Sequence, residues 1–300
     1  MRFISEHQVR EVLRFPELMG AMRDALRALS AGRVQQPVRG IIPVAEHNGW
    51  FGIMPAVYGD VMGAKLVTFY PANTRLPTHQ ATIQLFRAST GEPLATMDGR
   101  VITEMRTAAV SAVALDLLVA RTPLVLAIVG SGVQARSHLE AFRLIRDFKE
   151  VRVWSRTRSN AETFAAKAGA EVFESVETAV RGADVVVTLT SAAEPFLRAE
   201  WLKPERVVVA VGSVGAARRE LFDDVMGSPV IVESRESAVR EAGELIHSGA
   251  QVYAEIGELL NGVKPVPPRP AVYKSLGIAV EDIAAARLVY DSILEDRVAE

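Results

Sequence analysis

The chain has 300 residues, of which 49% are hydrophobic and 23% charged, and its formal net charge at pH 7 is −2. This near-neutral balance excludes the strongly basic surface of a protein that binds nucleic acid or adheres to an anionic membrane. The absence of cysteine excludes disulfides, thiolate nucleophiles and cysteine-ligated metals.

Other global features agree with a globular protein of one large or two moderate domains. The five histidines lack the H-x-x-x-H spacing of a zinc site, so we expect no bound metal. No apolar run reaches transmembrane length, and the first residues contain no secretory apolar segment. We therefore expect a cytoplasmic protein with no nucleic-acid partner and no membrane partner.

The N-terminal part is predicted to contain two helices and then a run of strands. Ser5 and Gln8 have the spacing of a capping box for the first helix. Pro16 starts the second, whose apolar residues recur at helical spacing until Gly32. Successive β-like runs then predict an antiparallel or mixed sheet, followed by an alanine-rich helix. The runs are Val38–Val44, Trp50–Val57, Gly63–Tyr70 and Gln80–Ala88, and the helix spans about Thr103 to Ala120.

Residues 123–137 contain the segment around which the chain is organised. The apolar run Leu124–Val129 predicts a strand buried on both faces, and a G-x-G-x-x-A turn follows it. In such a turn Gly130 permits the tight bend, Gly132 lets a pyrophosphate approach the backbone, and Ala135 lets helix and strand pack closely. The N-terminus of the next helix then holds the phosphates. The alternative is that these glycines serve only for turning.

From this point strands alternate with helices, which predicts a parallel sheet with covering helices. The proline-rich stretch 265–270 predicts an extended connection. The last helix, from about Ile278 to Leu294, is expected to return and pack on the N-terminal part. The predicted strands are Leu124–Val129, Val151–Trp154, Val185–Leu189, Val207–Val211 and Val230–Val232.

The end of the second of these strands indicates the type of dinucleotide. A fold that selects NAD usually places an acidic residue there for the ribose 2′-hydroxyl. This chain instead reads Ser155-Arg156-Thr157-Arg158. Guanidinium groups pair with a 2′-phosphate, whereas a carboxylate would repel it. We therefore expect NADPH (NADP) in preference to NADH; the alternative is a solvated basic turn.

Several motifs together resemble the ornithine cyclodeaminase/mu-crystallin family, and the similarity runs over nearly the whole chain. Those that carry the family resemblance are Gly130-Ser131-Gly132-Val133-Gln134-Ala135, Arg106-Thr107-Ala108-Ala109-Val110-Ser111, and Lys274-Ser275-Leu276-Gly277 followed by Glu281-Asp282. Further segments resemble the mu-crystallin branch of that family. These are Gln36-Pro37-Val38-Arg39, Lys65-Leu66-Val67-Thr68-Phe69-Tyr70, His79-Gln80-Ala81-Thr82, Met97-Asp98-Gly99 and Trp154-Ser155-Arg156-Thr157.

The resemblance implies an α/β fold with two domains and assembly into a homodimer. A Rossmann-type parallel sheet domain, residues 119–278, would bind NADP. An α+β domain made of residues 1–118 and 279–300 would bind the substrate and form the dimer. Members of the mu-crystallin branch reduce cyclic ketimines that carry a carboxylate, using NADPH. Other members cyclise ornithine with loss of ammonia, or oxidise alanine with NAD.

One departure from the family pattern bears on the reaction. Ornithine cyclodeaminases carry an aspartate shortly after the Val-Gly pair that precedes Glu-Leu, where this chain has Val214. An isopropyl group can neither take nor give a proton, so deamination loses its base. Reduction of an already protonated imine has less need of one. A local shift that brings Glu220 or Asp223 into this role is the less favoured alternative.

The resemblance also implies roles for individual residues. Arg39, Lys65 and Arg106 match basic residues around the substrate carboxylate, and His79 is a candidate polar group of the pocket. Lys65 is flanked by apolar strand residues, and a buried lysine is costly unless paired. Glu241 matches a pocket acid that would pair with the iminium nitrogen or relay a proton, so Lys65 and Glu241 are the candidate catalytic residues. The expected cofactor contacts are Thr107, Gly130, Gly132, Val133, Gln134, Ala135, Ser155, Arg156, Thr157, Arg158, Thr190, Val211, Ser213, Ser275 and Gly277.

Each of these residues also has a structural interpretation. Lys65 would otherwise lie on an outward strand face, and Arg39 and Arg106 in surface salt bridges. His79 would be a hydrogen-bonded structural histidine and Glu241 a solvated charge. Thr107 and the other cofactor positions outside the glycine turn would serve in ordinary caps and turns.

We therefore expect NADPH-dependent reduction of Δ1-piperideine-2-carboxylate or Δ1-pyrroline-2-carboxylate to pipecolate or proline, by hydride transfer to a protonated imine. One alternative is an ornithine cyclodeaminase or amino-acid dehydrogenase of the same fold. A second is an NADPH-dependent small-molecule binding protein without turnover, because a fold does not dictate its function.

Overall fold

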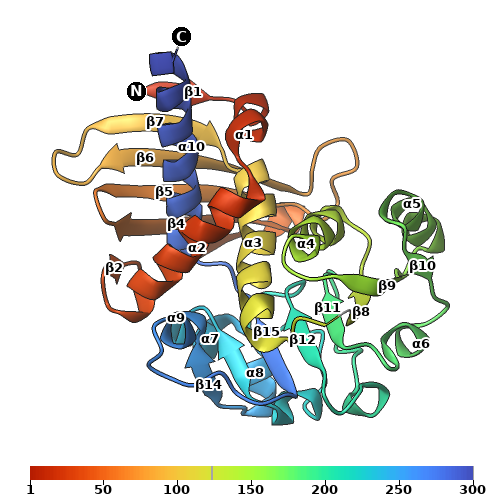
Figure 1. The fold of residues 1–300 in the computed structure, drawn as a ribbon. Coiled ribbons are helices and arrows are strands. Elements are labelled where there is room, and N and C mark those ends of the chain that lie inside the picture. Colours follow the sequence, from red (N-terminus) through yellow and green to blue (C-terminus); the bar gives the residue numbers. More distant parts are fainter. Residues whose placement is uncertain (123, 300) are drawn as a thin grey trace. The chain divides into compact units, whose positions relative to one another are not determined.

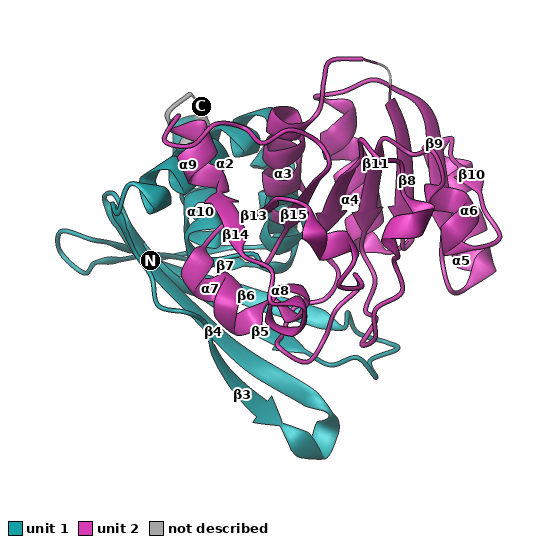
Figure 2. Ribbon diagram, turned by 90° about the horizontal axis from the view of Figure 1, so that it is seen from below, with its two compact units in different colours: residues 1–106, 277–300 teal, residues 107–276 magenta. Residues whose placement is uncertain are grey.

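The computed structural model describes residues 1–122 and 124–299, which form two compact units (Figure 2). Unit 1 combines residues 1–106 with 277–300, and unit 2 contains residues 107–276. Pro123, the first residue of the segment that holds the glycine turn, and Glu300 lie outside the described residues. The division into domains at residues 118/119 and 278/279 stays a prediction.

Unit 1 is built on a mixed sheet with the strand order β1-β7-β6-β5-β4-β2, in which β3 also pairs with β4 (Figure 1). The β1–β7 pair is parallel, and the other described pairs of this sheet are antiparallel. The expectation of a mixed sheet is thus confirmed. The strands are β1 (Arg2–Ile4), β2 (Val34–Gln35), β3 (Gly40–Val44), β4 (Gly49–Tyr58), β5 (Val61–Phe69), β6 (His79–Arg87) and β7 (Pro93–Asp98), with a 3₁₀ turn at Ala45–His47.

The helices of unit 1 are α1 (Glu6–Val12), α2 (Phe15–Ser30) and α10 (Ala279–Ala299). The predicted capping box at α1 is present, because Ser5 and Gln8 exchange side-chain to backbone hydrogen bonds. Helix α10 packs on α2 and on strands β4, β5 and β6, so the last helix does return to the N-terminal part (Figure 1). Its approach is close: a Cβ on Gly63 of β5 would lie 2.9 Å from the Ile283 side chain.

Unit 2 contains a sheet with the order β10-β9-β8-β11-β12-β15-β13-β14, and its described pairs are all parallel (Figure 1). Its central strands are buried along their whole length, as expected where both faces of a parallel sheet are covered. The strands are β8 (Leu124–Val129), β9 (Phe148–Trp154), β10 (Glu171–Val172), β11 (Val185–Thr188), β12 (Val207–Ala210), β13 (Val230–Val232), β14 (Val252–Glu255) and β15 (Ala271–Lys274).

The remaining helices alternate with these strands, which confirms the α/β fold class. They are α3 (Arg100–Leu118), α4 (Val133–Arg143), α5 (Arg158–Ala168), α6 (Val176–Val180), α7 (Arg235–Glu241), α8 (Gly243–Ser248) and α9 (Ile256–Leu260), with 3₁₀ turns at Ala199–Trp201 and Val225–Gly227. Within the described ranges no helix has the length and apolar character needed to cross a membrane.

The strand order of the unit 2 sheet determines which loops lie together at its carboxyl edge. Strand β15 lies between β12 and β13, although it follows both in the chain. The carboxyl ends of β8, β11, β12 and β15 therefore share one edge of the sheet, and ligands of open parallel sheets bind outside this edge.

Candidate functional site

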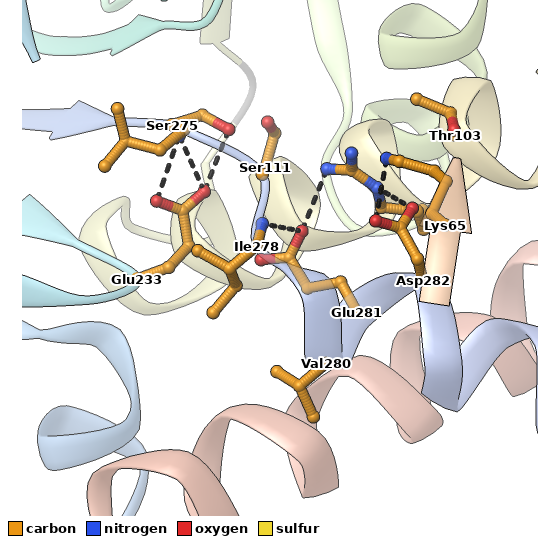
Figure 3. A network of polar contacts seen from close by, with 12 residues as sticks. Lys65, Thr103, Ser111, Glu233, Ser275, Ile278, Val280, Glu281 and Asp282 are labelled. Atoms are coloured by element: carbon orange, nitrogen blue, oxygen red, sulfur yellow. Dashed lines mark hydrogen bonds and ion pairs between the residues drawn. The ribbon is translucent and has the colours of Figure 1, made fainter. Parts of the chain in front are cut away.

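Unit 1 contains a buried cluster of charged side chains (Figure 3). Lys65, in the middle of β5, is only 1% exposed, and its Nζ lies 2.7 Å from Oδ2 of Asp282. Arg106 Nε donates to Oδ1 of the same carboxylate at 3.0 Å, and its Nη1 donates to Glu281 at 2.9 Å. Lys65 therefore does not lie on an outward strand face, and Arg106 is not part of a surface salt bridge.

The two acids come from the first turn of α10. A helix N-terminus favours negative charge there, since its backbone N–H groups lack intrahelical partners. The N–H of Ile278 donates to Glu281 at 3.3 Å, which helps to fix that carboxylate (Figure 3). Helix α10 thus places two carboxylates against the cations of β5 and α3.

The cluster changes the pKa values of its members. Burial lowers the pKa of Lys65 to about 8, although the carboxylate of Asp282 opposes this shift. Burial would raise the pKa of Asp282, but Arg106 and Lys65 together outweigh it and hold that pKa below its usual value. Burial, followed by the charges of Lys65 and Arg106, lowers the pKa of His79 to about 4. At neutral pH, His79 is therefore uncharged, and Lys65 carries a proton that it releases more readily than an ordinary lysine.

Arg39 and Gly277 belong to the same part of unit 1. Arg39 donates from Nη2 to the Gly277 carbonyl at 2.7 Å. Gly277 has φ +67°, and a Cβ there would lie 2.3 Å from Nη1 of Arg106. Glycine is therefore required at 277 both by the positive φ and because the guanidinium of Arg106 lies where a Cβ would be. The structure brings together the predicted substrate residues Arg39, Lys65, His79 and Arg106, and adds Glu281 and Asp282 to them.

In unit 2 the glycine turn has the geometry that the motif predicts. Gly130 has φ +119°, and a Cβ there would lie 2.7 Å from the Leu189 carbonyl oxygen. Gly132 precedes α4, and no atom lies within 4 Å of the place where its Cβ would be. Packing therefore does not require glycine at 132, whereas close approach of a phosphate would. Ala135 is fully buried, as expected where the helix packs on the strand. Val133 and Gln134 form the first turn of α4, whose N–H groups point to the same place.

The basic segment after β9 is exposed, as a site for a solvated phosphate requires. Thr157 is the N-cap residue of α5, and Ser155 and Arg156 precede it. Arg158 pairs with Glu162 at 2.9 Å and also with Glu174. Arg158 is thus already neutralised by two carboxylates.

Four of the other predicted cofactor residues, Thr190, Val211, Ser213 and Ser275, follow strands at the carboxyl edge of the unit 2 sheet. Thr190 donates its hydroxyl to Glu220 at 2.6 Å, and Ser213 donates to the Ala192 carbonyl at 2.6 Å. Ser275 donates to Glu233 at 2.9 Å (Figure 3). The hydroxyls of Ser213 and Ser275 could therefore only accept a hydrogen bond from a ligand. Val211 is buried, and so is Thr107 of α3.

These features agree with comparisons to known proteins. The model of the ornithine cyclodeaminase/mu-crystallin family matches residues 2–297. The chain belongs to this family. It is 48% identical to the ketimine reductase mu-crystallin of Mus musculus, over 97% of this chain and 96% of that protein.

Two solved structures share the fold. The Δ1-pyrroline-2-carboxylate reductase of Thermococcus litoralis, in complex with NADH and L-proline, gives a TM-score of 0.93 at 33% identity and covers 99% of this chain and 98% of its own. An archaeal alanine dehydrogenase dimer with bound NAD gives a TM-score of 0.93 at 28% identity, and the match covers 99% of this chain and 97% of that chain. The resemblance inferred from the sequence motifs is confirmed.

In the segment where ornithine cyclodeaminases carry an aspartate, Val214 packs against the apolar core of unit 2. Glu220, the substitute considered from the sequence, is fully buried and accepts hydrogen bonds on both carboxylate oxygens. Glu241 ends α7, is half-buried, and accepts from the Gly215 N–H through its backbone carbonyl at 2.8 Å.

From the sequence we did not assign Glu281, Asp282, Glu220 or Glu233 to the site. Glu281 and Asp282 entered the sequence analysis only as part of a motif that carries the family resemblance, and no role was predicted for them. The signal that would have found them is charge balance, because a buried Lys65 and Arg106 need buried acids. For Glu220 and Glu233 the sequence offers no comparable signal, since their partners are backbone and hydroxyl donors from distant segments.

Proposed function

We propose that this protein reduces cyclic ketimines that carry a carboxylate, converting Δ1-piperideine-2-carboxylate or Δ1-pyrroline-2-carboxylate to pipecolate or proline. It is an NAD(P)H-dependent imine reductase. The observation that carries the proposal is the convergence of three cationic side chains, Arg39, Lys65 and Arg106, in one cluster of unit 1 with Glu281 and Asp282. A cluster with two guanidinium groups and an ammonium group suits a substrate that carries a carboxylate.

The roles of the residues follow from their electrostatics. Arg106 and Arg39 bind the substrate carboxylate, for which planar guanidinium groups are suited. Lys65, with a pKa of about 8, keeps the imine nitrogen protonated. Neutral His79 contributes a hydrogen bond without adding charge. Glu241 is the second candidate for handling that proton.

The cofactor site lies in unit 2, where open space at Gly132 and the N-terminus of α4 fit a pyrophosphate. A nicotinamide dinucleotide, when bound, supplies the hydride. We propose NADPH in preference to NADH, and Arg156 as the main contact of the 2′-phosphate, because Arg158 already pairs with two acids.

This assignment can be tested by binding measurements. Arg156→Ala should raise the Kd for NADPH about tenfold to hundredfold and the Kd for NADH less than about twofold, since a charge-assisted phosphate contact is worth about 1.5–3 kcal/mol. Glu174→Gln should lower the Kd for NADPH without changing the Kd for NADH, because Arg158 then pairs with one carboxylate fewer. Equal effects on both cofactors would contradict the assignment.

Reduction is favoured over cyclodeamination because Val214 cannot serve as a base and Glu220 is enclosed by donors. Absorbance at 340 nm with NADPH and Δ1-piperideine-2-carboxylate tests the reductase directly. A parallel reaction with NAD⁺ and ornithine, assayed for ammonia, tests the alternative. Consumption of NADPH in the first and no ammonia in the second are expected. Tight NADPH binding with no turnover of imines in any assay would instead favour the non-catalytic binding protein.

We also propose a homodimer formed through the uncovered face of the unit 1 sheet. Strand alternation puts Lys65 and Ile83 on the face that α10 covers. The other face carries apolar residues of β3, β4 and β5 and polar residues of β6 such as Thr82. On that other face Ile42 is 54% and Ile53 36% exposed, an arrangement typical of an interface. Ile53→Arg should give a monomer by light scattering, whereas the exposed control Val263→Arg in unit 2 should stay dimeric. A dimer from Ile53→Arg would refute this interface.

A further inference from the structure

The fully buried ionisable side chains of unit 2 that the proposed reaction does not use include Glu220, Glu244 and Lys274. Glu220 follows the loop after β12, Glu244 lies in α8, and Lys274 ends β15. Burying three charges is costly, so their contacts need an explanation. Their hydrogen bonds and ion pair join segments that lie at the carboxyl edge of the sheet.

Glu220 connects the loop after β11 to the loop after β12. Its Oε1 accepts from the backbone N–H of Thr190 at 2.8 Å and from the Thr190 hydroxyl at 2.6 Å. Its Oε2 accepts from the Thr188 hydroxyl at 2.7 Å and from the Gly212 N–H at 2.9 Å. Each oxygen thus receives two donors, an arrangement that favours the ionised carboxylate. Burial nevertheless raises the pKa of Glu220, and the charge of Lys274 and the hydrogen bonds from Thr190 and Thr188 oppose that shift. In these contacts Glu220 serves as a fixed acceptor.

Glu244 and Lys274 attach this carboxylate to the rest of the edge. Glu244 Oε1 accepts from the backbone N–H of Glu220 at 3.0 Å, and its Oε2 lies 3.1 Å from Nζ of Lys274. Lys274 also donates to the Ser213 carbonyl at 2.5 Å. The end of β15, the loop after β12 and helix α8 are therefore joined by one continuous polar network.

The two loops that Glu220 connects also touch through their backbones. A Cβ on Gly212 would lie 2.2 Å from the Thr190 carbonyl oxygen and 2.5 Å from Glu220. The loops therefore have no room to shift relative to each other without breaking hydrogen bonds to Glu220.

We infer that Glu220, supported by Glu244 and Lys274, is a positioning residue that holds Thr190 and the segment 211–213 in place for the dinucleotide without touching it. This inference rests on the proposed function, in which both of those loops contact the cofactor. Loops fixed before binding lose little conformational entropy when the ligand arrives, which preserves affinity.

The network also determines which hydrogen bonds the Thr190 hydroxyl can make to a ligand. Its hydroxyl proton goes to Glu220, and its oxygen already accepts from the Ala192 N–H at 3.2 Å. Toward a ligand, Thr190 Oγ1 therefore acts only as an acceptor, which suits a hydroxyl or amide N–H of the cofactor and not a phosphate oxygen.

The test is Glu220→Gln, which keeps the size of the side chain but turns an NH₂ group toward backbone and hydroxyl donors. Binding of NADPH is followed by its fluorescence, together with Tm, kcat and the KM for the imine. We expect the Kd for NADPH to rise about tenfold or more, because one buried N–H loses its acceptor. The KM for the imine and kcat at saturating NADPH should change less than about threefold. Exposed Glu205→Gln in the same unit is the matched control.

Thr188→Val supplies a second variant if Glu220→Gln does not fold, since it removes one donor to Glu220 and keeps the shape. Its Kd for NADPH should rise about threefold to tenfold with the same kinetic pattern. An unchanged Kd in the folded variants, with only a lower Tm, would overturn the inference and leave a structural role. Absence of NADPH and NADH binding in the wild-type protein would instead overturn the proposed function itself.

Discussion

Asp282→Asn tests the unit 1 cluster most sharply, because one carboxylate serves both Lys65 and Arg106. The substitution keeps the shape and removes the charge. The amide must also direct its NH₂ group toward one of two cations that can only donate. Arg106 then keeps Glu281 as a partner, whereas Lys65 loses the carboxylate with which it pairs.

The size of the effect follows from the geometry. Unit charges 2.7 Å apart, the Lys65–Asp282 separation, attract by about 6 kcal/mol at an effective dielectric constant of about 20. Desolvation offsets part of this, and removing one partner of a buried pair typically costs about 3–5 kcal/mol. We expect Tm to fall by roughly 5–15 °C. Asp291→Asn is the matched control on the same helix, because the Arg287–Asp291 pair is exposed and should cost less than about 1 kcal/mol.

The pH dependence separates a catalytic effect from a loss of stability. Protonated Lys65 is the active form, so kcat/KM should fall as pH rises through its pKa of about 8. Asp282 raises that pKa, so its loss should move the alkaline fall to a lower pH. The assay is kcat/KM for the imine from pH 6 to 10, at a temperature where both proteins are folded. An alkaline limb at the same pH in wild type and variant would refute the role of Lys65.

Four further outcomes are expected. Arg106→Ala should raise the KM for the imine and lower kcat/KM by at least about thirtyfold, because a lost carboxylate contact costs about 2–5 kcal/mol; unchanged steady-state kinetics would remove Arg106 from the site. Val214→Asp should yield no ammonia from ornithine, and ammonia in that assay would mean that the remaining cyclodeaminase machinery is present. Gly132→Ala should weaken dinucleotide binding with little change in Tm, since its Cβ would meet only open space. Gly130→Ala should lower Tm strongly, because its φ is +119° and its Cβ would lie 2.7 Å from the Leu189 carbonyl; the reverse pattern in calorimetry and binding would contradict this reasoning.

The elements predicted well are those with local signals. The apolar run of β8 was placed at its observed bounds, as was β13, and the capping box of α1 was correct. The short β1, β2 and β10 were missed, because two or three residues carry no periodicity. Strand β15 was missed for another reason: it follows a proline-rich stretch, and its place between β12 and β13 comes from tertiary pairing.

In the candidate site, too, the residues with a local sequence signal were predicted and those that depend on distant contacts were not. Motifs located the glycine turn and the cations, since each is a recognisable string of residues. The contacts of the carboxylates were not predicted, because their partners lie far away in sequence: Asp282 meets Lys65, and Glu233 meets Ser275. A buried acid is recognised only when its donors are known, and folding brings those donors to it.

Unit 1 combines two separate parts of the chain, and this affects how the protein folds during synthesis. The sheet of unit 1 lies within residues 1–106, but α10, which covers that sheet and pairs with Lys65 and Arg106, is synthesised only after the whole of unit 2. Until Asp282 has been synthesised, Lys65 of the sheet and Arg106 of α3 lack this acid, and the apolar face of the sheet lacks its cover. Unit 1 therefore completes folding only after all of unit 2 has been made, and a chain truncated before α10 would be a substrate for proteolysis rather than a smaller working protein.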